Sequence, residues 1–530
     1  MEMIRLLFAL AVTRDWEVHH LDVKSSFLNE ELEEEVYVTQ PERFRRFHVK
    51  GHHPLPPGPP GLPVIGNLHQ LDMTSNLSDH LWRLSIHYGP LMSLRLGFVQ
   101  TVVVSSAEMA KHVLKTNDLV FCSRPLLTSQ QNLSYGNKDI AFSPYDENWR
   151  EMRKTCTLHL FRLMKQVNVF RPVREEEVFD MIDSIKTRFA NKHVVNLSEL
   201  VMILTINIIS RVAFGRRSSG YDDEEQRING LLLQSQAMFA CFFYRDHFPF
   251  MGWLDILNGS MARLEKNFKD LDGFYQELID EHVNSNKPNN MQEDMVDILL
   301  KLKNESDSTL KLTYDHIKAI LMNILLGGTE TSATTVVWAM TLLMKNPQSL
   351  NKVQQEVRSE IGNKGRVHED DLYKLKYLKS VIKETYRLHP VVPLLIPHES
   401  RDRCVLGFYE IPKKTIVHVN ALAIGRDPKC WQRPEVFEPE RFMGCSIDYK
   451  GNDYELIPFG SGRRGCPGMS LGATTVELTL SNLVYLFDWE LPEGMSDIDT
   501  LTSPGTIARK KNDLRLVAKV YDHECTFTSS

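Results

Sequence analysis

The stretch Phe459-Gly-Ser-Gly-Arg-Arg-Gly-Cys-Pro-Gly468 carries more chemical information than any other part of this sequence. Its glycines allow tight turns and let a ligand approach the backbone closely. Cys466 precedes Pro467, a residue suited to the first position of a helix, and an apolar run follows. The sulfur is therefore predicted to lie at a helix N-terminus, where the dipole lowers a thiol pKa and favours the metal-binding thiolate. Arg464 is placed to meet an anionic group beside that metal.

A second signal lies within a long apolar segment, residues 313–345, which is predicted to be one helix. It contains Leu325-Leu-Gly-Gly-Thr-Glu-Thr-Ser332. Two adjacent glycines inside a helix cost about 1 kcal/mol each relative to alanine, which indicates that something approaches the backbone there. Glu330 and Thr331 are polar groups in apolar surroundings. They are either functional or the solvent-facing side of a packing kink.

Two further helices carry paired polar side chains. Trp149 and Arg153 are spaced i and i+4, so they share one helix face. Glu384 and Arg387 are spaced i and i+3 in a helix that ends before Pro390. Any helix can carry such a pair by chance, and alone each spacing is weak.

Composition narrows the class of protein. The 530 residues are 42% hydrophobic and 25% charged, as expected for a globular core, and the net charge of −6 gives no argument for nucleic acid. The eight cysteines form no CxxC motif, which argues against a disulfide scaffold or zinc module and suits a cytosol-facing protein. The apolar run at residues 3–12 is too short to span a bilayer, and no signal-peptide cleavage pattern follows.

The hydrophobic patterns predict a mainly α protein with a minor β part. Residues 64–125 alternate strand-like and helix-like runs, and short strands return beyond residue 400. Helices are expected near 174–190, 196–213, 262–285, 313–345 and 371–389. The proline-rich run at 54–63 is stiff and extended, and it suits either a linker or a hinge that orients a domain at a membrane surface. We expect one large catalytic domain over 64–520, preceded by an atypical segment at 1–53 and followed by a tail at 521–530.

The stretch at 459–468 matches, at every fixed position, the heme-binding signature of the cytochromes P-450, Phe-x-x-Gly-x-Arg-x-Cys-x-Gly. Other segments resemble the plant A-type enzymes of the seventy-one clan, and the eighty-three family looks especially similar. These segments are LPPGPPGLPVIGNLHQLD, RPLLTSQQNLSY, FRPVREEE and VNALAIGRDPKCW. The resemblance covers about residues 54 to 520 and implies the cytochrome P-450 fold, a single heme-binding domain.

The resemblance assigns the cofactor and its contacts. Cys466 would be the axial thiolate of heme b, Arg464 would pair with a propionate, and Phe459 would pack near the sulfur. Trp149, through its indole N–H, and Arg153 would also meet propionates. His398 stands where the family often has an arginine near a propionate, although a satisfied surface histidine fits equally well.

The resemblance also assigns residues away from the cofactor. Gly328 would open room for dioxygen, and Glu330 with Thr331 would relay protons to it. Glu384 and Arg387 would form a buried charge network with Arg441. Five largely apolar segments would line the substrate pocket: Phe121–Phe142, Met238–Phe250, Leu321–Thr331, Val391–Ile396 and Thr502–Thr506.

The implied activity is insertion of one atom of dioxygen into a lipophilic small molecule of plant specialised metabolism. Electrons would come from NADPH through NADPH–cytochrome P-450 reductase, with cytochrome b5 as a further donor. Arg150 and Lys154 suit either a basic patch for this partner or an ordinary solvated face. Aldoxime, terpenoid, phenylpropanoid and fatty-acid substrates all stay open. The alternative is a heme-thiolate isomerase or dehydratase without a reductase, but such relatives usually lose the pair found here as Glu330 and Thr331.

The N-terminal segment departs from the family. Residues Trp16 to Phe44 resemble the start of a copia-type reverse transcriptase, with Asp22 at a metal-binding position, but the other polymerase parts are missing. We interpret the segment as a fusion or gene-model artefact, and a retroelement-derived nucleic-acid protein is the alternative. The membrane anchor usual in relatives is not evident. Localisation at the cytosolic face of the endoplasmic reticulum, with contact to the membrane surface, therefore depends on the resemblance alone.

Overall fold

The computed structural model describes residues 53–71, 76–161, 169–188, 193–216, 223–284, 293–305 and 311–522, with short pairs at 17–18 and 38–39. Asp22 lies outside these residues. Contacts divide the chain into a small unit, Met1–Pro56 with Arg403–Pro412, and a large unit, Pro57–Asp402 with Lys413–Ser530. The large unit contains every residue singled out above for chemistry except Asp22.

Helices dominate the large unit, as predicted. Its first half contains α3 (Leu77–Tyr88), α4 (Ala107–Lys111), α5 (Asp118–Phe121), α6 (Thr128–Leu133), α7 (Glu147–Cys156), α9 (Arg171–Arg188), α10 (Leu197–Phe214), α11 (Asp223–Phe239), α12 (Tyr244–His247), α13 (Gly252–Leu257) and α14 (Ser260–Asn284). The second half contains α15 (Met295–Asn304), α16 (Tyr314–Gly328), α17 (Glu330–Lys345), α18 (Pro347–Ile361), α19 (Lys376–Leu388), α20 (Ala421–Gly425) and α21 (Met469–Leu486). Short 3₁₀ or π turns occur at Leu68–Gln70, His112–Thr116, Thr157–Phe161, Glu369–Lys374, Pro439–Phe442 and Gly462–Arg464.

Local sequence explains where several helices begin and end. Thr313 caps α16, with its hydroxyl accepting the N–H of His316 and the His316 side chain reaching back to the cap. Pro347 opens α18, where its missing N–H costs nothing. The helix expected over 313–345 is divided at Thr329, which separates α16 from α17.

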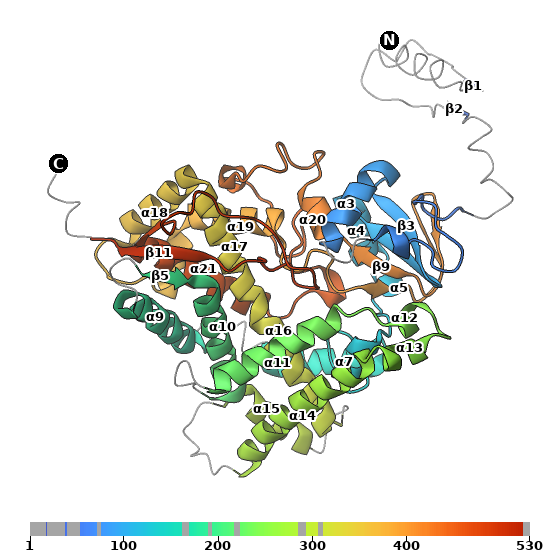
Figure 1. Ribbon diagram of the computed structural model, residues 1–530, viewed down its shortest axis with the longest axis horizontal. Helices are drawn as coiled ribbons and strands as arrows, with labels where there is room; N and C mark the ends of the chain where they lie inside the picture. The colour runs from blue at the N-terminus through green and yellow to red at the C-terminus, as the bar shows by residue number, and fades with distance from the viewer. Residues whose placement is uncertain are drawn as a thin grey trace. The chain divides into compact units, whose positions relative to one another are not determined.

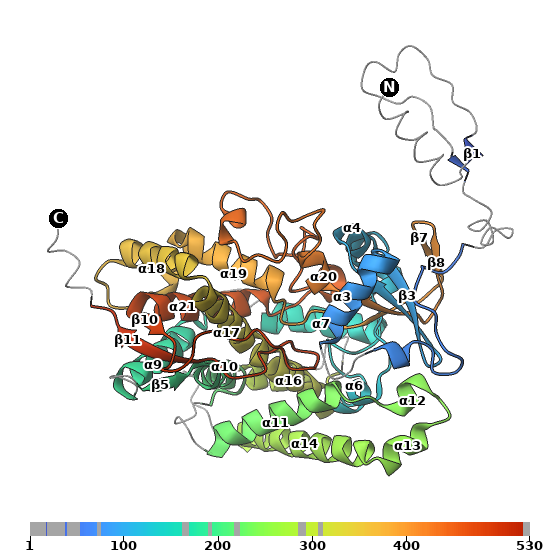
Figure 2. The same cartoon turned by 45° about the horizontal axis from the view of Figure 1, so that its top comes forward.

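Helices α10, α17 and α21 pack together in the core, and α16 and α17 run through the middle of the large unit (Figure 1). Among the described helices, only α10 is long and apolar enough to cross a membrane, and 67% of that window is buried inside the protein. This burial identifies α10 as a core helix. Figure 2 shows α11 and α14 lying along one side of the same unit.

A four-stranded sheet combines segments far apart in the sequence. Its order is β3 (Leu91–Leu96), β4 (Val99–Val104), β9 (Ile416–Val419) and β6 (His398–Glu399), and β4 runs parallel to β9. Figure 1 shows the blue β3 and the orange β9 in the same sheet, in which β4 lies between them. A second sheet joins β10 (Phe487–Glu490), β11 (Arg515–Val520) and β5 (Val194–Asn196).

The proline-rich run is hydrogen-bonded to the sheet, unlike a free linker. The N–H of Ser93, on β3, donates to the carbonyl of Pro57 at 2.8 Å. A Cβ added to Gly58 would lie 1.8 Å from the carbonyl oxygen of Ser93. Residues 57–67 therefore form a strap along the outer strand of the sheet, and only glycine fits at its closest approach.

Two antiparallel pairs make up the described strands of the small unit. One joins β1 (Glu17–Val18) to β2 (Val38–Thr39), and the other joins β7 (Cys404–Leu406) to β8 (Tyr409–Ile411). The N–H of Glu410 donates to the carbonyl of Pro54 at 2.9 Å.

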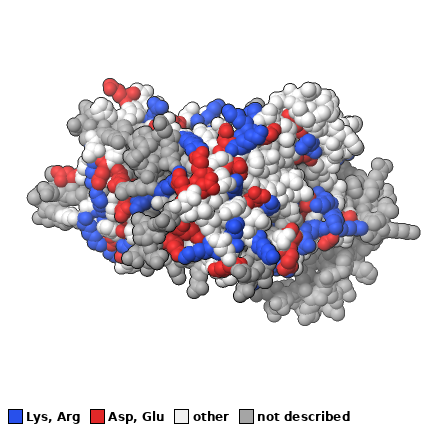
Figure 3. Space-filling view, turned by 90° about the horizontal axis from the view of Figure 1, so that it is seen from below, with Lys and Arg blue, Asp and Glu red and all other residues white. Residues whose placement is uncertain are grey.

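Charges of both signs are interspersed over the face of the molecule drawn in Figure 3. This mixture agrees with the small net charge and shows no large single-sign area on that face.

Candidate active site

Cys466 lies in the turn before α21 and opens onto a cavity of about 590 Å³. Its backbone N–H donates to the carbonyl of Phe459 at 2.9 Å, which closes the glycine-rich loop. The N–H groups of Gly468 and Met469 donate to its sulfur, as predicted for a helix N-terminus. Burial nevertheless outweighs these contacts and raises the thiol pKa. The thiolate at this position therefore needs a cation facing it across the cavity.

Three arginines surround the same end of the cavity, and all three line it. Arg464 donates from Nε to the carbonyl of Cys122 and from Nη2 to that of Ser143, both at 2.7 Å. Arg153 donates to the carbonyl of Gly465 at 2.6 Å. Arg124, which the sequence reasoning missed, donates to the carbonyls of three residues: Ala141, Ile396 and Pro397.

Backbone carbonyls are the only hydrogen-bond partners that these three guanidinium groups have among the described residues. Burial lowers the pKa of Arg464 to about 10, and it lowers the pKa values of Arg124 and Arg153 as well. Buried cations without a counter-charge are costly. The arrangement therefore suits an anionic cofactor whose carboxylates would compensate these charges, with a metal ion opposite the sulfur of Cys466.

Trp149 and His398 lie beside this cluster but are oriented differently from the predictions. The indole N–H of Trp149 donates to the carbonyl of Ile140 at 3.0 Å, not toward the cavity. Its ring instead stacks under Arg464, with the guanidinium carbon 3.8 Å from the ring centroid. His398, on β6, is buried, and its Nδ1 lies 2.7 Å from the carbonyl oxygen of Phe121. Burial and the neighbouring Arg124 lower its pKa, so the imidazole is neutral near pH 7.

The predicted polar pair, Glu330 and Thr331, lies at the break between α16 and α17. Thr331 lines the cavity, and its hydroxyl donates to the carbonyl of Gly327 at 2.7 Å. The side chain of Glu330 is 3% exposed, and one of its oxygens, Oε2, has no hydrogen-bond partner. Burial raises its pKa, while Arg509, 3.8 Å away, and a hydrogen bond with Gln236 lower it only in part.

The two glycines of this helix differ in what surrounds them. A Cβ on Gly328 would lie 2.5 Å from Cδ1 of Ile209 on α10, whereas a Cβ on Gly327 would meet nothing within 4 Å. Gly328 was predicted to make room for dioxygen. In the structure, close packing between α16 and α10 allows only glycine at this position. Gly327 is the one that faces open space.

The structure brings Glu384, Arg387 and Arg441 together. Arg387 grips both carboxylate oxygens of Glu384 at 2.7 Å, and both side chains are completely buried. Nε of Arg441 donates to the same carboxylate at 3.0 Å. Phe459 lies nearby, with its ring centroid 5.3 Å from that of Tyr386. These contacts tie α19 to the loop that leads to Cys466.

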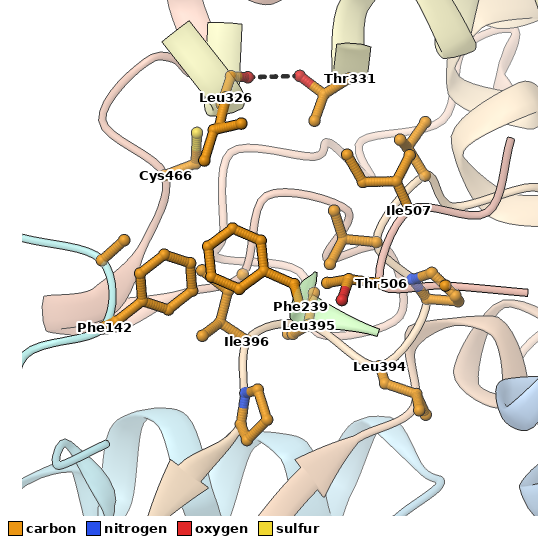
Figure 4. Close-up of a pocket in the computed structure, with 18 of the residues that line it drawn as sticks. Phe142, Phe239, Leu326, Thr331, Leu394, Leu395, Ile396, Cys466, Thr506 and Ile507 are labelled. Atoms are coloured by element: carbon orange, nitrogen blue, oxygen red, sulfur yellow. Dashed lines mark hydrogen bonds between the residues drawn. The ribbon is translucent and has the colours of Figure 1, made fainter. Parts of the chain in front are cut away.

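Aromatic and aliphatic side chains form the rest of the cavity wall. Phe142 and Phe239 stack with ring centroids 5.0 Å apart and an interplanar angle of 29°. Figure 4 shows these two rings between Cys466 and Ile396. All five segments predicted to line the pocket contribute residues to it. The sequence gives no signal for the additional lining from β4 and β9, Thr101 and His418, because only the parallel pairing of these strands brings them together.

The family model described as Cytochrome P450 matches residues 56–517 of this chain. The chain belongs to the cytochrome P450 family. As predicted, it is a heme-thiolate monooxygenase that uses heme b and takes electrons from NADPH through a redox partner. Lipophilic substrates and dioxygen are the other partners of this P450. Residues 1–50 match a different model, described as Reverse transcriptase (RNA-dependent DNA polymerase), in agreement with the N-terminal resemblance.

Several plant enzymes are similar to this P450 over most of their length. A 6,7,8-trihydroxycoumarin synthase from Pastinaca sativa is 50% identical over 477 residues, which cover 88% of this chain and 93% of the relative. A 5-OH-xanthotoxin synthase from Ammi majus is 48% identical, with 88% and 93% covered. Cytochrome P450 71B34 from Arabidopsis thaliana is also 48% identical, with 89% and 95% covered. Among solved structures, a zebra fish cytochrome P450 with progesterone has a TM-score of 0.73 and 27% identity over 83% of this chain and 99% of that chain.

Proposed function

We propose that this P450 hydroxylates an oxygen-bearing aromatic compound of the coumarin type. The stacked pair of Phe142 and Phe239 carries the proposal, because it gives the cavity a flat aromatic wall suited to a planar ring. Two of the similar plant enzymes bear the names of synthases for hydroxylated coumarin or xanthotoxin products. Terpenoid and fatty-acid substrates, which lack such a ring, gain less from this wall.

Heme b, when bound, supplies the iron that activates dioxygen. We assign the sulfur of Cys466 to the iron, and Arg464, Arg153 and Arg124 to the carboxylates of the cofactor. Trp149 acts by stacking on Arg464. His398, as a neutral imidazole, fills the space beside Arg124.

We assign proton delivery to the polar pair at the helix break. Thr331 lines the cavity, and burial raises the pKa of the Glu330 carboxyl group, which favours its proton-carrying form. Arg509 is 43% exposed, so it connects this acid to the solvent. Gly327 and Gly328 both line the cavity. Gly327 leaves open space beside the backbone there, and Gly328 lets α16 pack closely against Ile209. The triad of Glu384, Arg387 and Arg441 fixes α19 against residues 425–441, and Tyr386 on the same helix packs against Phe459 of the loop that holds Cys466.

We further propose NADPH–cytochrome P450 reductase as the electron donor, with cytochrome b5 as a second donor, and the exposed Arg150 and Lys154 as part of the docking surface. The cytosolic face of the endoplasmic reticulum is the proposed location, by analogy with the plant relatives. The domain boundaries at 54 and 64 are likewise proposals. The ranges that the two family models match support only the first of them, and the second rests on the end of the proline-rich run.

The test is turnover by the purified full-length protein with reductase, NADPH and dioxygen carrying a heavy oxygen isotope. Coumarin-type compounds should yield products with one labelled oxygen atom, and Cys466→Ala should yield none. Faster labelled turnover of terpenoid, fatty-acid or aldoxime compounds than of any coumarin would refute the substrate class. Turnover without NADPH would refute the monooxygenase route.

A further inference from the structure

Gln130 is a buried amide in the wall of the cavity. The residue is 8% exposed and lies among the side chains that line the cavity. Its Oε1 is buried and has no hydrogen-bond partner. A buried amide oxygen without a partner costs about 1–3 kcal/mol, and such groups in native proteins call for an explanation.

The position of Gln130 is fixed by its short helix, α6. The carboxylate of Asp246 accepts the backbone N–H of Thr128 at 3.0 Å and its hydroxyl at 2.5 Å, which anchors the start of α6 to α12. Leu133, at the end of α6, is buried in the core. The amide therefore cannot turn to solvent without moving the helix.

The other cavity-lining polar side chains near the stacked rings differ from Gln130. Asn323 is satisfied, because its Oδ1 accepts the N–H groups of Ile140 and Ala141 and its Nδ2 donates to Asp139. The hydroxyls of Thr205 and Thr335 donate to carbonyls of their own helices. Among the described residues that line the cavity, Gln130, Thr101 and His418 each have a buried side-chain atom without a hydrogen-bond partner, and Gln130 is the one of these three that carries an amide.

We infer that the Gln130 amide is a specificity-determining contact, which hydrogen-bonds an oxygen substituent of the substrate. A side-chain amide both donates and accepts, so it suits a phenolic hydroxyl or a lactone carbonyl. A flat ring against Phe142 and Phe239 supplies apolar contact, and the single amide fixes the direction of its oxygen. This inference deepens the proposed function. Only the choice of a coumarin as the substrate rests on that proposal; the contact between Gln130 and a substrate oxygen does not.

The chain offers a matched control on the same helix, because the neighbouring Gln131 is exposed. We would compare Gln130→Leu, Gln130→Met and Gln131→Leu in the heme-loaded, full-length protein. Binding is measured from the shift of the heme absorption band during titration with pairs of probe compounds. One member of each pair carries an oxygen substituent and the other does not. One pair is 7-hydroxycoumarin and naphthalene, and the other is geraniol and its hydrocarbon counterpart without the hydroxyl.

Both Gln130 variants should bind 7-hydroxycoumarin roughly tenfold more weakly than the parent, with naphthalene affinity kept or improved. They should also unfold at a higher temperature without ligand, because an unpaired amide has been replaced by an apolar group. Gln131→Leu should change neither affinity. If the Gln130 variants lose the preference for the oxygen-bearing compound only in the geraniol pair, the result would support Gln130 as a substrate contact and refute the coumarin class.

Other outcomes would overturn the inference. Equal weakening for both members of each pair would show that Gln130 only shapes the cavity. Unchanged discrimination in both pairs would show that the amide contacts no substrate. Faster loss of heme from Gln130→Met, whose side chain has the same length, would assign the residue to the cofactor instead.

Discussion

Arg124 binds three backbone carbonyls and, among the described residues, has no carboxylate partner. We expect Arg124→Met to release heme about tenfold faster than the parent, because a buried hydrogen bond to a charged group is worth about 1.5–3 kcal/mol. Transfer of heme to an excess of heme-free myoglobin measures this rate. The exposed Arg150 provides the control, and Arg150→Met should release heme at the parental rate. Equal rates for all three proteins would remove Arg124 from the cofactor site.

Glu330 should make the stability of the protein depend on pH in a defined direction. Its pKa in the folded protein is raised above the ordinary value of 4.5 by burial. Below that value both states are protonated and the residue has no effect. As the pH rises toward and through the folded pKa, the unfolded chain loses its proton first, and stability falls.

Replacement by glutamine removes this effect. Glu330→Gln should therefore be more stable than the parent at pH 7, and the advantage should shrink toward pH 4. Thermal unfolding between these limits measures it, with Glu360→Gln, at an exposed site, as the control. An advantage that is constant across this range would mean that the folded protein does not raise the pKa of Glu330 and that packing explains the gain.

Single residues differ in how far the sequence could predict them. Cys466 and Arg464 are part of a loop with its own spacing, so their positions around the cavity follow from the chain alone. Arg124 and Gln130 carry no such spacing, and the resemblance places them only within Phe121–Phe142, a segment expected to line the pocket, without assigning a role to either. Their importance arises from segments that meet them only in three dimensions.

At the scale of helices, the paired glycines of α16 can be separated by substitution. Gly328→Ala should destabilise the protein by about 1–3 kcal/mol, because its Cβ would strike Ile209. Gly327→Ala should be neutral or stabilise by up to about 1 kcal/mol, because its surroundings are open. Urea unfolding measures both. Adding Ile209→Val, which removes Cδ1, should reduce the cost of Gly328→Ala, and additive effects would argue against the contact.

The charge network that joins α19 to Arg441 and to backbone carbonyls between residues 425 and 436 should matter far more than a surface pair. Arg387→Met should lower the free energy of unfolding by about 3–5 kcal/mol, because it leaves the carboxylate of Glu384 buried with only Arg441 beside it. Lys352→Met, which removes the exposed pair with Glu440, should cost less than about 1 kcal/mol. Similar losses in urea unfolding would contradict the role assigned to burial.

Elements were predictable where a periodic pattern and a cap agree. Helices α10 and α14 fall within a few residues of the expected ranges. The helix expected over 313–345 is two helices in the structure, because the hydroxyls of Thr329 and Thr331 take up carbonyls around the glycine pair. Apolar periodicity continues through such a break, so the pattern cannot reveal it.

For the molecule as a whole, a chain that begins at Pro54 should keep the catalytic properties of the full chain. The P450 match begins at residue 56, and Pro54 still provides its contact to Glu410. We expect the same red-shifted carbon monoxide band and an unchanged unfolding temperature. Loss of the band on removal of residues 1–53 would show that this segment belongs to the folded enzyme.

The overall arrangement was predictable only through the heme-binding signature. Composition and periodicity indicate a mainly helical protein, but they do not place β4 beside β9, which lie more than 300 residues apart. Likewise, nothing in the proline-rich run indicates that it lies against β3.

That placement has a consequence for how the molecule behaves in a crowded cell. The outermost strand of an open sheet presents unpaired backbone groups, which invite strands from other chains and seed aggregates. The strap at residues 57–67 blocks this route, since its prolines cannot extend the ladder further and the carbonyl of Pro57 already occupies the N–H of Ser93. The proline-rich segment, a kind of sequence that usually serves as a spacer, thus also protects the edge strand β3 from pairing with strands of other copies of the enzyme.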